Sequence, residues 1–179
     1  MSKLTITEAL AELKTIGKRL DKKRDFVVQY LMRPEQVRDP LEKEGGTSRA
    51  IGEERQGIRD LQNRIIALRR AIQLANEANT ISIAGDTRSI ADWLVWRREV
   101  APWHQQMLAL LRSKIDSVRN ETLRRGAAIA APGTDTKAGD VIVNISEQEL
   151  AREIERLEET LGTLDGQLSL KNATVLIEA

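Results

Sequence analysis

The stretch "LAREIERLEETLGTLDGQLSL", residues 150–170, indicates the fold class of this chain. Its apolar residues recur at alternating steps of four and three, namely Leu150, Ile154, Leu157, Leu161, Leu164 and Leu168. This period places them on one stripe of an α-helix, with charged residues on the other faces. Because so narrow a stripe is stabilised mainly by packing against another helix, the stretch predicts a helix over about residues 146–171 in a bundle or coiled-coil hairpin.

Three more segments show a helical period, over about residues 5–32, 48–78 and 89–126. The first has the seam Ile6, Leu10, Leu13, Leu20, Val27 and Leu31, and the second has the seam Ile58, Leu61, Ile65, Leu68, Ile72 and Ala75. Capping boxes are expected at Thr5 with Glu8, at Ser89 with Asp92 and at Ser146 with Glu149. Proline lacks the backbone donor of a helix, so Pro102 predicts a kink or a break just before Trp103.

Between the helices we expect two loops, about residues 33–50 and 127–140, and short strands at 81–83 and 141–145, with 174–177 as a candidate third strand. The expected fold is mainly α, an antiparallel bundle of long helices or coiled-coil hairpins with one small β-sheet. Residues 1–179 are expected to form a single elongated helical domain. Whether the strands pair within one chain or between chains is left open by the sequence.

Composition narrows the classes of function. The 28 basic and 27 acidic residues nearly cancel, which argues against a field that attracts nucleic acid. The chain has no cysteine and a single histidine, so disulfides, thiolate metal sites and multi-histidine metal sites are excluded. No stretch has the roughly 18 apolar residues of a membrane span, and the N-terminal segment lacks the apolar core of a signal peptide. We therefore expect a soluble protein of intracellular origin with neither a nucleic-acid nor a membrane partner.

The segment "SIADWLVWRREVAPWHQQ", residues 89–106, holds all three tryptophans and the only histidine. Tryptophans dominate the energetics of cores and interfaces, and at helical spacing they predict a packing face. We assign this face to a protein interface formed by Trp93, Trp96, Val100, Trp103 and Met107, with Leu110 continuing it. A core face, a peptide groove and a ligand or stacking platform for nucleic acid are the alternatives; the last is weakened because Asp92 and Glu99 offset Arg97 and Arg98.

No pattern in the sequence supports a reaction. His104 has no nucleophile motif beside it, and a general base needs a positioned partner. Asp135 and Asp140 resemble a calcium loop only loosely, since the twelve-residue pattern places Ser146 at the last ligand position. We therefore expect no catalytic residue, no cofactor and no metal.

The order of the segments resembles a family of small bacterial proteins of unknown function, the septicolysin-like proteins. The matching pieces are short: Glu8–Ala9–Leu10, Asn79–Thr80, Gly85–Asp86, Ser89–Ile90, Leu94 with Arg97–Arg98, Leu164–Asp165 and Asn172–Ala173–Thr174. Tryptophans replace smaller residues in the third helix, and the tail extends past Thr174. The resemblance implies a helical bundle that self-associates, and it implies no catalytic activity.

These observations lead to two hypotheses. The first is a non-enzymatic structural subunit that self-associates or docks into a larger particle, for which a bacteriophage virion component (a head-decorating, fibre or connector protein) is the natural setting. The alternative is a cytoplasmic oligomeric adaptor of the septicolysin-like kind. The chain would act in the virion if it is phage-encoded and otherwise in the bacterial cytoplasm.

Overall fold

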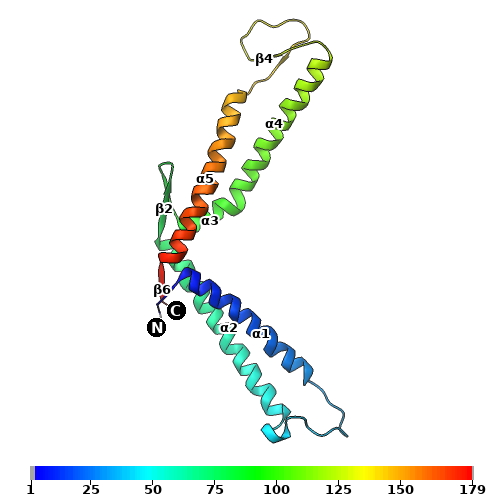
Figure 1. The fold of residues 1–179 in the computed structure, drawn as a ribbon, viewed down its shortest axis with the longest axis vertical. Coiled ribbons are helices and arrows are strands. Elements are labelled where there is room, and N and C mark those ends of the chain that lie inside the picture. Colours follow the sequence, from blue (N-terminus) through cyan, green and yellow to red (C-terminus); the bar gives the residue numbers. More distant parts are fainter. Residues whose placement is uncertain (1–2, 179) are drawn as a thin grey trace. The chain divides into compact units, whose positions relative to one another are not determined.

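A computed structural model describes residues 3–178 and confirms the mainly helical class with short paired strands (Figure 1). The described chain divides into two compact units, each with its own core, where the sequence predicted one domain. Unit 1 comprises the residues up to Ala78 together with those from Ser169 onward, and unit 2 is Asn79–Leu168. This division arises because the seams of neighbouring helices are buried two by two.

Unit 1 is built on a hairpin of α1 (Ile6–Gln29) and α2 (Thr47–Ala78) (Figure 1). The capping box of α1 is confirmed: Thr5 Oγ1 accepts from the Glu8 amide at 3.2 Å, and Glu8 Oε2 accepts from the Thr5 amide at 2.7 Å. The hairpin core consists of buried Ile6, Ala9, Ile16, Leu68 and Ile72, with Ile177 added from the C-terminal strand.

The seam expected on α1 is wrong at two places: its second member is off by one position, and its last member lies beyond the end of the helix at Gln29. Leu10 is 41% exposed and Leu31 is 60% exposed, whereas Ala9 and Ile16 are buried. Steps of three and four from Ile6 reach both Ala9 and Ile16, so the period was correct. The sequence interpretation preferred the larger leucine, while the structure buries the small alanine between two closely packed helices.

The two chain ends are joined by β1 (Lys3–Thr5) and β6 (Leu176–Glu178), which pair antiparallel. Ile177 lies opposite Leu4 and is buried in the unit 1 core. The candidate strand at 174–177 is thus found at 176–178. Its partner is a three-residue strand that the sequence analysis did not predict, because so short a segment has no readable alternation.

The loop before α2 is organised by Asp39. Its carboxylate accepts hydrogen bonds from the Leu41 and Thr47 amides, both at 2.9 Å, and from the Thr47 hydroxyl at 2.5 Å. These hydrogen bonds stabilise the charged form and hold the pKa of Asp39 below its usual range. The backbone reaches Thr47 through Gly45 and Gly46, whose φ angles of 97° and 92° favour glycine.

Unit 2 begins with a β-hairpin of β2 (Thr80–Ile83) and β3 (Asp86–Ser89), which turns at Ala84 and Gly85 with positive φ at both. A long helical segment follows: α3 (Ile90–Val95), a π-helical turn (Trp96–Val100) and α4 (Ala101–Arg124). The last helix, α5 (Glu147–Thr174), packs against α4 (Figure 1). Its predicted seam is confirmed, since Leu150, Leu157, Leu164 and Leu168 are buried.

The loop between α4 and α5 contains β4 (Ile129–Ala130) and β5 (Val141–Ile142), which pair in parallel. Asp140 organises this loop: its carboxylate accepts from the Ala128 amide at 2.9 Å and from the Lys137 amide at 2.7 Å. Both hydrogen bonds lower the pKa of Asp140. Of the residues expected in a strand at 141–145, only the first two are in one.

The expectation of one small sheet is corrected. In the described part of the chain, the strands form three separate two-stranded sheets, β1 with β6, β2 with β3 and β4 with β5. The 81–83 strand pairs with the residues that follow its own turn, and the strand at 141 pairs with the loop before it. These two strands pair locally, and a two-residue turn and a loop cost less entropy to close than a contact between distant segments, whereas β1 and β6 join opposite ends of the described chain.

Candidate interaction surface

The predicted interface residues lie on both sides of the π-helical turn Trp96–Val100. The Ala101 amide donates to the Trp96 carbonyl, a bond that spans five residues instead of four. Pro102 follows immediately and has no amide to continue the α-helical ladder, which accounts for the wide turn at the place where a kink or break was expected. A π turn holds more residues per turn than an α-helix. The side chains of α3 are therefore rotated away from the single helical face that the regular spacing predicted for Trp93 through Leu110.

Trp93, on the α3 side of this turn, belongs to the unit's own core. Its side chain is 3% exposed, and its indole N–H donates to the Ile81 carbonyl at 3.0 Å. The Arg88 guanidinium lies 5.0 Å from the ring centroid, in the range of a cation–π contact. Trp93 therefore anchors the β2–β3 hairpin on α3. For this residue the structure favours the core, which the sequence had left as an alternative, over the predicted protein interface.

Trp96 and Met107 occupy half-buried positions. Trp96 meets the Trp93 ring edge to face at 5.4 Å and packs at the margin of the core between α4 and α5. Met107 packs against the same core. Each therefore contributes part of its side chain to unit 2 and leaves the rest on the surface.

Val100, the last residue of the turn, and Trp103, near the start of α4, are exposed at 47% and 66%. Leu110 continues their line and is 69% exposed. The steps from Val100 to Trp103, Met107 and Leu110 are three, four and three residues, the spacing of a coiled-coil seam. We call Val100, Trp103, Met107 and Leu110 the outer seam of α4.

A second seam on α4 was missed by the sequence analysis. It faces α5, and we call its buried members, Ala101, Leu108, Ile115 and Thr122, the inner seam. They recur every seven residues, with half-buried Leu111 and Val118 between them. This repeat was readable from the apolar members at 108, 111, 115 and 118. The sequence analysis took the neighbouring, tryptophan-containing face as the packing face of this helix and did not consider a second one.

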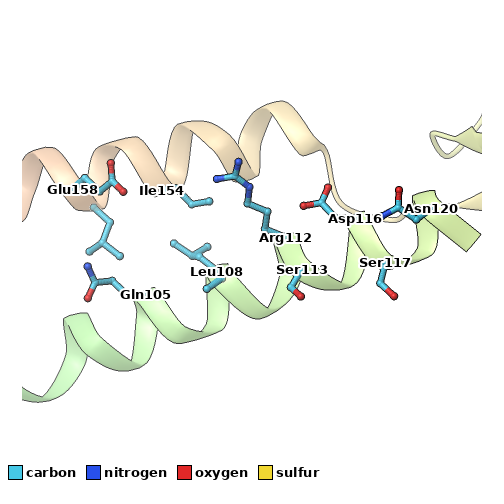
Figure 2. Close-up of a pocket in the computed structure, with 11 residues that line it drawn as sticks. Gln105, Leu108, Arg112, Ser113, Asp116, Ser117, Asn120, Ile154 and Glu158 are labelled. Atoms are coloured by element: carbon cyan, nitrogen blue, oxygen red, sulfur yellow. The ribbon is translucent and has the colours of Figure 1, made fainter.

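An open groove of about 630 Å³ runs along α4 and α5. Leu108 and Ile154 lie between the two helices, and Arg112 extends from α4 toward α5 (Figure 2). Polar side chains surround this apolar floor: Gln105, Arg112, Ser113, Asp116, Ser117, Asn120 and Glu158. The lining contains both charges but no nucleophile paired with a histidine base, so it offers a surface for binding and no evident chemistry.

His104 is placed beside α5. Its Nε2 atom lies 2.9 Å from Glu153 Oε1, and its side chain is 29% exposed. A carboxylate at this distance orients the imidazole, and the contact ties α4 to α5. With no serine or threonine hydroxyl hydrogen-bonded to the ring among the described contacts, the structure gives His104 a bridging role.

Among the described residues, neither a group of metal ligands nor a membrane-spanning helix is present. Within residues 3–178, no group of three or more His, Cys, Asp or Glu side chains is arranged to hold a metal ion. Asp140, the loop acid of the loose calcium-loop pattern, uses its carboxylate oxygens on backbone amides instead. None of the helices in the described range combines the length and the apolar character needed to cross a bilayer.

Comparison with known proteins shows the fold alone. No family model and no curated protein matches the chain. A crystal structure of a functionally unknown conserved protein from Corynebacterium diphtheriae is similar, with a TM-score of 0.57 and 14% identity over 99% of this chain and 100% of that one. The architecture therefore occurs in a solved protein of unknown function, and the resemblance to the septicolysin-like family gains no support from these comparisons.

Proposed function

We propose that this protein is a non-enzymatic assembly subunit that docks through the outer seam of α4. The exposure of Trp103 carries the proposal: a tryptophan that is 66% exposed lies in line with Val100 and Leu110 on a helix whose inner seam is already filled by α5. Large aromatic side chains aligned with other apolar residues on a surface are typical of interaction sites. The occupant is another copy of the chain or another structural protein.

The near balance of charge fits a particle component, because such a protein must pack against its neighbours without charge repulsion. The absence of cysteine is compatible with the same role. As the setting of this role we propose a bacteriophage virion if the chain is phage-encoded, and otherwise the bacterial cytoplasm. Genes for capsid or tail proteins beside the coding gene would support the first setting.

The experiment compares two matched variants. Trp103 and Leu123 are both on α4 and both 66% exposed, but only Trp103 lies in the outer seam. Trp103→Ala should weaken self-association at least about tenfold, since truncating an interface tryptophan commonly costs about 2 kcal/mol or more. Leu123→Ala should leave association unchanged. Molar mass by light scattering over a concentration series measures both.

The helical content of each variant, measured by circular dichroism, should remain that of the parent chain, because the altered side chains are exposed. A parent chain that stays monomeric over the whole series and captures no protein through the seam contradicts the proposal. Equal weakening by Trp103→Ala and Leu123→Ala would also contradict it.

A further inference from the structure

We infer that the occupant of the outer seam is a second copy of this chain, whose α4 packs parallel and in register with the first. This inference rests on the proposed function and adds the partner and its orientation. In this arrangement, Val100 of one copy faces Val100 of the other across a two-fold axis along α4. Met107 then faces Met107 in the same way.

The residue types of the seam favour this arrangement. Taking Val100 and Met107 as the a positions of a heptad makes Trp103 and Leu110 the d positions. A β-branched residue at a followed by leucine at d is typical of two-stranded parallel coiled coils. Val100 supplies the β-branched residue at one a position and Leu110 the leucine at one d position, while Met107 and Trp103 fill the other two, so each feature occurs once in the 11 residues from 100 to 110.

The flanking charges supply an independent argument. Glu99 belongs to the π turn and directly precedes the first a position, which places it on the g side of the seam. His104 follows Trp103 and is at e. In a parallel pair, a g side chain reaches the e position five residues further along the other helix. Glu99 of each copy would thus face His104 of the other, giving two symmetric contacts between a carboxylate and an imidazole.

Both groups are available for this contact. The Glu99 side chain is 60% exposed, and its contact with Arg98 at 2.7 Å is a surface pair that contributes little to stability. Glu153 engages Nε2 of His104, which leaves Nδ1 for a second carboxylate. The contact across the dimer would therefore extend the His104–Glu153 contact that already links α4 to α5.

The antiparallel alternative lacks this complementarity. When two copies of the same seam run in opposite directions, e positions face e positions and g positions face g positions. His104 would then lie opposite His104, and Glu99 would lie opposite uncharged Ser113. The charge pattern consequently selects the parallel orientation.

The size of the seam sets the expected strength. Each tryptophan buries about 150–250 Å² at most, and the other seam residues are smaller. Two such seams bury less than the roughly 1,200 Å² of a stable standard-size interface unless neighbouring surfaces join them. We therefore expect a dimer that dissociates on dilution, and its detection requires concentrations from about 1 µM to about 200 µM.

The absence of native cysteine allows a clean cross-linking test on the full chain. Three single-cysteine variants are compared under mild oxidation: Val100→Cys, Met107→Cys and, as a control outside the seam, Leu123→Cys. Parallel packing in register brings both seam cysteines close to their own copies, so both variants should form disulfide-linked dimers in high yield. The control should form few, because disulfides require Cα atoms within about 7 Å of each other.

In an antiparallel pair, Val100 would lie near residue 110 of the other copy. The two cysteines of Val100→Cys would then be about 15 Å apart along the axis. A chain that dimerises by light scattering but links at neither or only one of the two seam positions overturns the parallel register and leaves self-association standing. Linking of Leu123→Cys as strongly as the seam variants overturns it as well. A chain that is monomeric throughout overturns both this inference and self-association as the proposed role.

Discussion

The two helical hairpins of this protein are built on the same heptad principle but pack differently. The backbones of α1 and α2 approach each other more closely than those of α4 and α5. In the first hairpin, small residues stand at the contact, with Ala9 fully buried and Gly57 so near Lys23 that an added Cβ would lie 2.9 Å from its Nζ atom. In the second, leucine and isoleucine fill the contact from both sides, and a groove of about 630 Å³ remains.

The ion pairs across the two hairpins differ in how far they are buried, and those of the first hairpin are the more buried. Arg64 binds Glu12 through two hydrogen bonds of 2.8 and 3.1 Å, and Lys23 binds Glu54 at 2.8 Å; all four side chains are about 30% exposed. These pairs close α1 against α2.

The α4–α5 hairpin also has contacts between its helices, His104 with Glu153 and Arg119 with Glu147, but their carboxylates are 51% and 45% exposed. An exposed seam and an open groove remain beside them. The first hairpin is thus the more tightly closed of the two, although Val28, Ile66 and Leu74 stay exposed on it, and the second leaves the outer seam and the groove open.

The largest expected effect comes from a charge in the α4–α5 core. Leu157 is 6% exposed and packs in an apolar cluster, so Leu157→Asp should cost about 3–5 kcal/mol by placing a carboxylate there. Amide hydrogen exchange should show loss of protection along α4 and the first half of α5, with α1 and α2 retained. The exposed Leu123→Asp serves as control and should change little. Simultaneous loss of protection in α1 and α2 would show that the two hairpins unfold as one unit and are not independent.

An effect of intermediate size is expected when the same leucine-to-alanine change is made in each of the two cores, and the loss of stability should differ between them. Leu68 is fully buried between α1 and α2, and Leu108 is 2% exposed but lines the groove. Leucine-to-alanine changes cost about 2–5 kcal/mol, more where the site cannot collapse. Leu68→Ala should therefore lie at the upper end and Leu108→Ala at the lower end, measured as the free energy of local unfolding from hydrogen exchange. The reverse order would show that the α4–α5 core is the more tightly packed of the two.

The smallest effect concerns pH and the Glu12–Arg64 pair. Its hydrogen bonds from Arg64 lower the pKa of Glu12 below the ordinary value of about 4.5. The stabilisation is therefore present above pH 4.5 and is lost as the pH falls through the lower folded pKa. With both side chains about one-third exposed, a double-mutant cycle should give a coupling of only about 0.2–1 kcal/mol.

Glu12→Gln should remove this part of the acid dependence of α1–α2 stability, and a titration of the Glu12 carboxyl by NMR should report the lowered pKa directly. Glu53→Gln is the matched control, since Glu53 pairs with Arg49 within the same helix rather than across the hairpin. A Glu12 that titrates at its ordinary pKa would show that the Arg64 contact contributes nothing to closing the hairpin.

The sequence by itself determined the helices and the seam of α5. The four-and-three spacing from Leu150 to Leu168 places every member on one helical face, and the whole stripe is buried or half-buried. The caps at Thr5, Ser89 and Ser146 are also local, because each joins a hydroxyl to an amide three residues away. Such features depend on neighbours within one turn, so they are readable without knowledge of the fold.

The tertiary structure decided which residues those seams meet and which remain exposed. The π turn before Pro102 rotates Trp93 into the core and leaves Trp103 on the surface, although a regular helical spacing predicted one common face. The strand at 176–178 pairs with 3–5, a contact between opposite ends of the sequence. Helix phase after an irregular turn, and pairing between distant segments, depend on the free energy of the whole packed unit, which no local pattern records.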